Sequence, residues 1–148
     1  MTSLVKYYLE DLEVGMSAST TATITAEMID TFADITGDHN PIHMDDDAAR
    51  ANGFDGRIAH GALSASFISA VLGNELPGPG GVFVELNLRF RKPAMIGDEI
   101  LAVAEVAEIN ERTGRVKMKC HCEAGGVKIC RGDAGVFVSK RPADAGDK

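Results

Sequence analysis

The second half of the chain alternates apolar and polar residues, which is the pattern of a half-buried β-strand. From Val82 to Lys92, valine, leucine and phenylalanine at every second position would share one face, and mostly charged residues the other. The same alternation predicts strands over Ile100–Ile109, Arg115–Glu123 and Val127–Lys140, which together form an antiparallel meander. A β-branched run, Ser17–Thr25, predicts one more strand near the N-terminus.

A helix with a single apolar stripe is expected after the first strand. Ile29, Phe32 and Ala33 lie at helical spacing and form the stripe. Thr25 is a suitable N-cap for this helix, and Gly37 is a suitable terminator.

The segment that follows predicts a loop and then a short helix. Pro41 is expected to keep the loop from continuing the helix. The short helix should cover Asp45–Ala51 and close at Asn52–Gly53.

The stretch from His60 to Gly73 predicts a different kind of helix, because it carries no acidic or basic residue after His60. A helix that is apolar nearly all round is buried. One buried helix among antiparallel strands indicates an α+β fold. Such a unit leaves much apolar surface for 148 residues, so two chains are expected to pair.

The composition indicates one domain, residues 1–140, followed by a flexible polar tail at residues 141–148. The net charge of −7 disfavours partners such as nucleic acid or an anionic membrane surface. No apolar run approaches the roughly 20 residues that span a bilayer. Three cysteines and the lack of a signal-like N-terminus favour the reducing cytoplasm.

Two of the cysteines are expected in the core of the meander. Cys120 and Cys122 share a strand face with apolar neighbours. If Ala124–Gly125 forms the hairpin loop, Cys122 lies opposite Val127 and Cys120 lies opposite Ile129.

The polar stretch GDHNPIHMDDD, residues 37–47, holds the candidate chemistry. One interpretation is a metal site built from His39, His43, His60 and Asp45–Asp47. The spacing disfavours it, because His39 and His43 lie four residues apart across Pro41 and cannot share a regular helical face. The three aspartates also have a simpler role at the start of the next helix. We therefore expect no metal.

A second interpretation is acid–base catalysis. Asp38 and His43 could hold one water molecule between them as a general acid–base pair. Free backbone N–H groups at Gly61, where the buried helix starts, could form an oxyanion hole. The chain has no G-x-S-x-G element and no activated cysteine, so covalent nucleophilic catalysis is disfavoured.

Three elements occur in order along the chain: D-x-N-P-x-H, A-H-G and F-x-x-P-x-x-x-G-D. In this combination the chain resembles the MaoC-like (R)-specific enoyl-CoA hydratases from about Tyr8 to Val138. The resemblance implies a hot-dog fold, in which an antiparallel sheet wraps round a central helix and two units form a homodimer. It also implies an acyl-CoA thioester substrate and no cofactor.

The resemblance further assigns roles to individual residues. It implies that Asp38 and His43 are catalytic and that Gly61 supplies the oxyanion N–H. The expected substrate-binding residues are Asn40, His60 and Ser69. The implied reaction is hydration of a trans-2-enoyl-CoA to an (R)-3-hydroxyacyl-CoA, or the reverse dehydration.

Two other functions stay open at this stage. A hot-dog acyl-CoA thioesterase would use the same fold, and a non-catalytic acyl-binding subunit would bind without turnover. The sequence does not place the residues that hold the CoA phosphates. Arg89, Arg91 and Lys92 are candidates by charge alone, and a solvated strand face is the more ordinary role for them.

Overall fold

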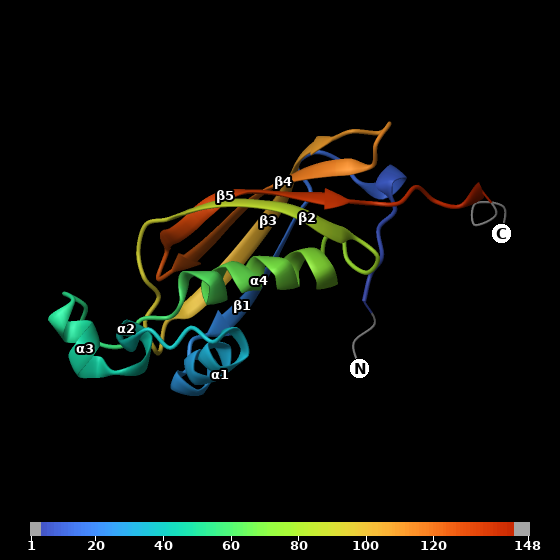
Figure 1. The fold of residues 1–148 in the computed structure, drawn as a ribbon. Coiled ribbons are helices and arrows are strands. Elements are labelled where there is room, and N and C mark those ends of the chain that lie inside the picture. Colours follow the sequence, from blue (N-terminus) through green and yellow to red (C-terminus); the bar gives the residue numbers. More distant parts are fainter. Residues whose placement is uncertain (1–3, 144–148) are drawn as a thin grey trace.

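The structure is a computed structural model that describes residues 4–143. Within that range five strands form one antiparallel sheet in the order β1-β3-β4-β5-β2. The strands are β1 (Ser17–Thr23), β2 (Val82–Phe90), β3 (Glu99–Ile109), β4 (Arg115–Ala124) and β5 (Val127–Phe137). The long helix α4 (Gly61–Asn74) crosses one face of the curved sheet (Figure 1). The expected α+β fold is therefore confirmed.

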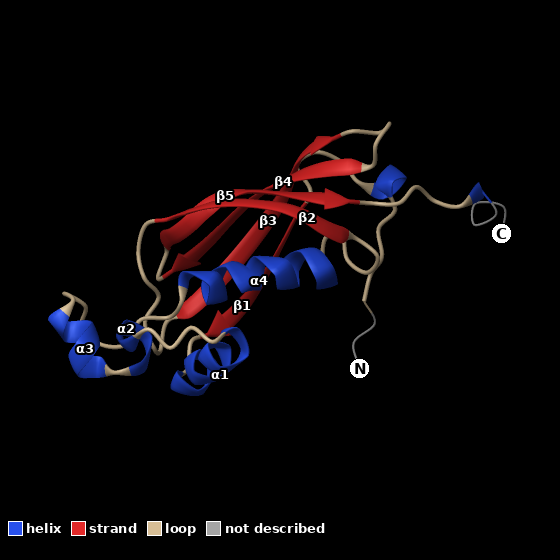
Figure 2. Ribbon diagram, in the orientation of Figure 1, coloured by secondary structure: helices blue, strands red, loops and turns tan. Residues whose placement is uncertain are grey.

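The remaining helices gather at one end of the sheet, beside the N-terminus of α4 (Figure 2). They are α1 (Ala26–Thr36), α2 (Pro41–Met44) and α3 (Asp46–Ala51). A short 3-10 turn, Leu9–Asp11, lies at the opposite end of the sheet (Figure 1). No helix among the described residues is long and apolar enough to cross a membrane.

The core lies between α4 and the sheet. Ile68 and Val71 of α4 are fully buried, and they belong to one apolar cluster with Ile100, Met118 and Val136 of the sheet. Burial of this much apolar surface stabilises the fold. It also fixes where the first turn of α4 lies, and that turn carries the candidate oxyanion hole.

The far face of α4 is open. Its small residues Ala62, Ser66, Ser69 and Gly73 are exposed. The expectation that this helix is buried all round is therefore wrong for a single chain, because the sheet covers only one side of it.

Strand β2 also leaves apolar surface uncovered. Val82 is 53% exposed and Val84 is 43% exposed. The reason is that β2 lies at an edge of the sheet, where no further strand follows it. An exposed apolar edge strand is a ready pairing surface for another chain.

The segment before the candidate catalytic residues is more helical than expected. Thr25 caps α1 as predicted, since its Oγ1 accepts a hydrogen bond from Met28 N, and Gly37 ends the helix with a φ of 82°. The prediction that Pro41 blocks helix is wrong: Pro41 is the first residue of α2, and Asn40 Oδ1 caps Ile42 N. Proline fits there because the first helical N–H has no partner to lose.

The β4–β5 hairpin turns one residue later than predicted. Its loop is Gly125–Gly126, and Ala124 pairs with Val127. Both loop residues have positive φ, 57° and 80°. A two-residue turn of this kind requires positive φ at both positions, which glycine adopts without strain and alanine does not.

The predicted cysteine register is consequently wrong as well. Cys122 lies opposite Cys130 rather than Val127, and Cys120 lies opposite Gly132 rather than Ile129. Besides the later turn, a bulge beside Cys122 shifts the pairing. The core placement itself is confirmed, because all three cysteines are buried and free.

Residues near the two ends of the described range meet beside the 3-10 turn. Leu9 N donates to Ser139 O, and the backbone N–H of Arg141 donates to the carboxylate of Glu10. Arg141, the first residue of the expected tail, is thus held in place. Residues 144–148 lie outside the described range.

Candidate active site

His43 is held rigidly at the end of the single turn α2. Its side chain is buried, and its Nδ1 lies 2.8 Å from Ile58 O. A carbonyl oxygen only accepts, so Nδ1 carries a proton and Nε2 is the ring atom left for chemistry. Arg57 Nε donates to His43 O at 2.6 Å and fixes the backbone as well.

Asp38 lies on the short connection between α1 and α2. Its backbone N–H donates to Thr36 Oγ1, and its Oδ1 accepts from Asn40 N at 3.2 Å. Asn40 also caps α2 through its side chain. Asn40 therefore shapes the turn that presents both Asp38 and His43.

His60 contacts both Asp38 and His43 from the buried side of the site. Its ring stacks on the His43 ring with the centroids 3.9 Å apart, and its Nε2 donates to Asp38 O at 2.9 Å. Phe32 packs nearby at 4.9 Å. His60 is only 2% exposed, and its Nδ1 has no hydrogen-bond partner among the described residues. The ring therefore supports the pair and lies away from the solvent-facing side of the site.

The three side chains converge. One carboxylate oxygen of Asp38 and one ring nitrogen each of His43 and His60 all lie within 4.8 Å of one another. These are possible metal ligands by type. However, the two rings are stacked at 28°, so their nitrogens lie in nearly parallel planes. Stacked rings are less suited to holding one ion than rings whose planes converge on it.

The other candidate metal ligands are dispersed. His39 faces outward, and its Nε2 lies 3.1 Å from Asp34 Oδ1. The hydrogen bond with Asp34 raises the pKa of His39 above its ordinary value. Asp45 caps α3, and Asp46 accepts from Arg57 N, so these aspartates serve the loop and the helix.

Gly61 begins α4, and its N–H has no recorded partner within residues 4–143. A side chain at this position would be tightly placed. A Cβ there would lie 3.2 Å from Cε1 of Phe90, closer than side chains ordinarily pack. Phe90 thus closes over the helix N-terminus, where the free N–H and the helix dipole favour a partial negative charge.

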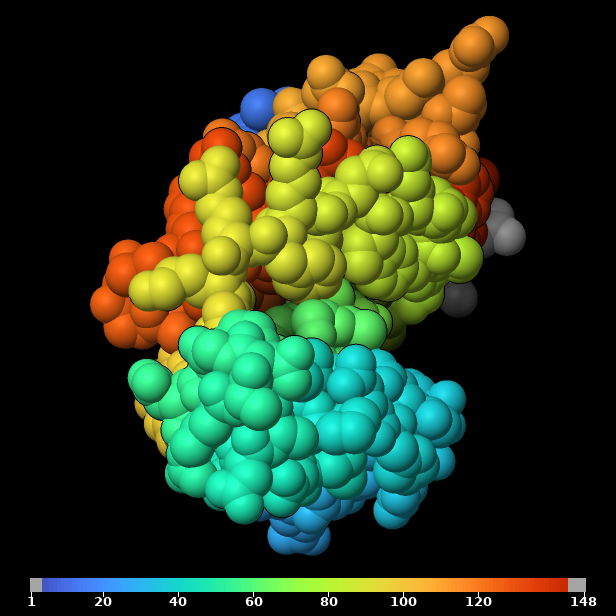
Figure 3. Space-filling model, turned by 60° about the vertical axis from the view of Figure 1, so that its left-hand side comes forward, coloured from blue at the N-terminus to red at the C-terminus, as the bar shows by residue number. Residues whose placement is uncertain are grey.

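A pocket of about 290 Å³ opens at this point. Its walls come from His43 and Phe54 on one side, from Gly61 and Ser64 of α4, and from residues 90–94, which begin at the last residue of β2. In Figure 3 the start of α4 is visible between the blue-green helices and the yellow segment that follows β2. Asp38 stands beside the pocket rather than in its wall.

The structure does not bring Ser69 to this site. It lies eight residues after Gly61, about 12 Å further along the helix, and is exposed. Sequence reasoning missed Ser64 and Phe90. Ser64 follows Gly61 by three residues, so the helical period could have placed it on the same face; Phe90 carried no such signal.

Comparison with known proteins decides the family. Residues 11–125 match the model of the MaoC-like domain. The chain belongs to the MaoC-like family. A 3-hydroxybutyryl-CoA dehydratase of Methylorubrum extorquens is 43% identical, covering 90% of this chain and 85% of that protein. An (R)-specific enoyl-CoA hydratase of Rhodospirillum rubrum is 41% identical, covering 93% and 96%.

Solved structures agree. The R-hydratase PhaJ1 from Pseudomonas aeruginosa has a TM-score of 0.85 at 35% identity, covering 90% of this chain and 86% of that one. An (R)-hydratase from A. caviae involved in PHA biosynthesis has a TM-score of 0.84 at 33% identity, covering 87% and 98%. The MaoC-like chain thus has the expected hot-dog fold and is an enzyme of the hydratase and dehydratase class.

Proposed function

We propose that this protein catalyses (R)-specific hydration of trans-2-enoyl-CoA to (R)-3-hydroxyacyl-CoA, and the reverse dehydration. The supporting observation is the convergence of Asp38 and His43 beside the free N–H of Gly61. This reaction needs a base for water, an acid for C2 and donors for the thioester oxygen. The three residues supply one each.

In the proposed mechanism Asp38 and His43 hold the water between them. Asp38 takes a proton from the water as its oxygen bonds to C3. The electrons of the double bond move toward the thioester oxygen, which Gly61 N–H stabilises. His43 then delivers a proton from Nε2 to C2, and proton exchange between the two residues restores the starting state.

The hydrogen bond to Ile58 O bears on the role of His43. Because Nδ1 already donates to that carbonyl, His43 can deliver a proton from Nε2 only as the imidazolium.

The three residues expected to bind substrate are given different roles in this proposal. Asn40 shapes the loop between Asp38 and His43. His60 is a positioning residue, because it touches both of them and is almost fully buried. Ser69 could line an acyl site only if a second chain covers the open face of α4.

We propose a homodimer for the same reason. The edge strand β2 and the open face of α4 leave apolar and small residues uncovered in one chain. A symmetric pairing through β2 would cover them. The proposed chemistry uses no metal or redox cofactor, and the three buried free thiols suit a reducing cytoplasm.

The test is turnover of crotonyl-CoA, followed by the loss of enoyl-thioester absorbance. Asp38→Asn and His43→Gln should each lower kcat about 10²–10⁴-fold. The matched controls are Asp34→Asn and His39→Gln, which remove the same side-chain types from a nearby surface pair and should turn over normally. Near-normal turnover in either site variant would overturn the assignment.

The thioesterase alternative has a different product. It would release free thiol from acyl-CoA, and a non-catalytic binding subunit would produce neither signal. Absorbance loss without thiol release supports the hydratase.

A further inference from the structure

The outer face of the sheet, away from α4, carries a broad hollow of about 1160 Å³ that extends over all five strands. Six of the 15 lysines and arginines of this net-acidic chain line it. They are Arg89, Arg91, Lys117, Lys119, Lys128 and Arg131. Two carboxylates, Glu105 and Asp133, line the same hollow. Positive charge is therefore concentrated on one surface.

Like charges face each other within this surface. Arg89 lies directly opposite Arg131 across the β2–β5 pair. Like charges in this arrangement destabilise a sheet. Neither arginine has a salt bridge within the described part of the chain. Asp133, two residues after Arg131 on β5, accepts a hydrogen bond from Asn87 instead. An external anion would relieve the repulsion.

This surface is continuous with the catalytic pocket through Arg91. Arg91 lines both hollows, and Lys92 lines the pocket beside it. Arg89 precedes Arg91 by two residues, so their Cα atoms are about 7 Å apart if the chain stays extended. The cations thus begin at the pocket wall and spread from there across the sheet.

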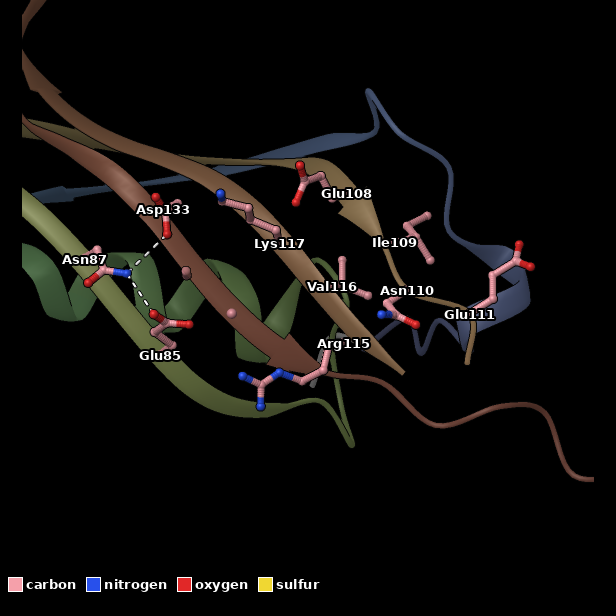
Figure 4. A pocket seen from close by; sticks show the side chains of 12 residues that line it. Glu85, Asn87, Glu108, Ile109, Asn110, Glu111, Arg115, Val116, Lys117 and Asp133 are labelled. Carbon is pink, nitrogen blue, oxygen red and sulfur yellow. Dashed lines mark hydrogen bonds between the residues drawn. The ribbon is translucent and has the colours of Figure 1, made fainter. Parts of the chain in front are cut away.

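The opposite boundary of the surface carries four carboxylates and only two cations, Arg115 and Lys117. Figure 4 shows Glu85, Glu108 and Asp133 around the neighbouring hollow, where Asn87 Nδ2 lies 3.0 Å from Glu85 Oε1 and 3.3 Å from Asp133 Oδ1. Binding of an anion that extends from the pocket is therefore favoured near Arg91, Arg89 and Arg131. It is disfavoured at the neighbouring hollow, where the carboxylates gather.

We propose that Arg89, Arg91 and Arg131 bind the phosphate groups of the coenzyme A part of the thioester while its acyl group lies at His43 and Gly61. This inference rests on the proposed function. Guanidinium groups match phosphate oxygens in pairs of hydrogen bonds. Coenzyme A carries a diphosphate and a 3′-phosphate, so it presents several such groups in a row. The hollow shape favours this ligand over a flat protein partner.

The experiment compares two thioesters that differ in phosphate. Crotonyl-CoA carries the phosphates, and crotonyl-pantetheine does not. For Arg89→Gln and for Arg131→Gln, the ratio of the crotonyl-CoA KM to the crotonyl-pantetheine KM should rise about tenfold over wild type, as expected for one lost charged contact. Arg112→Gln, the same charge change in the distant β3–β4 turn, should leave the ratio unchanged.

An unchanged KM ratio in both Arg89→Gln and Arg131→Gln would overturn the inference. An equal rise of the ratio in Arg112→Gln would overturn it too, because it would indicate only a long-range attraction between the protein's positive charge and the phosphates. If the same variants impair crotonyl-acyl carrier protein while sparing crotonyl-CoA, the surface binds an acidic carrier protein and the proposal is wrong. If wild type hydrates neither thioester, the proposed function itself fails. Misfolding is controlled by the thermal midpoint, which should not fall, because each variant removes one of two facing like charges.

Discussion

Replacing His60 with phenylalanine should separate activity from stability. The hydrogen bond from His60 Nε2 to Asp38 O is 2.9 Å long, and a bond of this kind stabilises a protein by about 0.5–1.5 kcal/mol. The unpaired Nδ1 costs about 1–3 kcal/mol. Phenylalanine removes both and keeps a ring stacked on His43. Since Asp38 is exposed, water can replace the lost donor.

The expected change in unfolding free energy is therefore within about 2 kcal/mol, measured by urea denaturation. The expected effect on catalysis is larger. His60 connects the two catalytic candidates, because it stacks on the His43 ring and donates to Asp38 O. Without that hydrogen bond Asp38 can shift relative to His43, and a shift of about 1 Å in a catalytic group can lower the rate about 10²-fold. We expect kcat on crotonyl-CoA to fall about 10–100-fold. KM should change much less, because His60 is too deeply buried to contact substrate.

Two further variants sharpen this test. His60→Gln keeps a donor at a similar reach and should recover part of the kcat. Phe32→Leu loosens the packing near the His60 ring but keeps the hydrogen bond, so it should lower stability by about 1 kcal/mol and leave kcat close to wild type. Unchanged kcat in His60→Phe, or a rise in KM alone, would refute the positioning role.

Three other predictions follow from the structure. Gly61→Ala should lower kcat in the crotonyl-CoA assay, because the new Cβ meets the Phe90 ring at 3.2 Å. The double variant Gly61→Ala/Phe90→Leu should recover part of the lost kcat, and no recovery contradicts the steric reason. Burial raises the pKa of the Cys120 thiol to about 12, so iodoacetamide at pH 8 should leave it unmodified in native protein and alkylate it in urea, as read by mass spectrometry. The hydrogen bond with Asp34 raises the pKa of His39. The pairing therefore stabilises the fold at pH below the pKa of His39 in the unfolded chain, and this stabilisation is lost as pH rises through the pKa of His39 in the folded protein. In Asp34→Asn the midpoint of the His39 titration, followed by NMR, should move to lower pH, and an unmoved midpoint contradicts the pairing.

Several local elements could be predicted because their causes lie within a few residues. The Thr25 cap and the Gly37 terminator depend on neighbouring backbone groups alone. The prediction failed at Pro41 because proline both ends and begins helices, and the choice depends on whether Asn40 is free to cap. The predicted hairpin register was wrong because the turn lies one residue later than expected and a bulge follows Cys122. Each of these changes which side chains face each other across the strand pair.

The sequence by itself determined the chemical types at the site, the order of the elements and the alternation that builds the sheet, because each of these follows from residue identity and spacing along the chain. Only the tertiary structure decided that His60 supports Asp38 and His43 from behind, and that Ser69 lies far from them. It also decided that Arg89 faces Arg131 next to the pocket. These relations join residues distant in sequence, and packing of α4 against the sheet sets the distances between them.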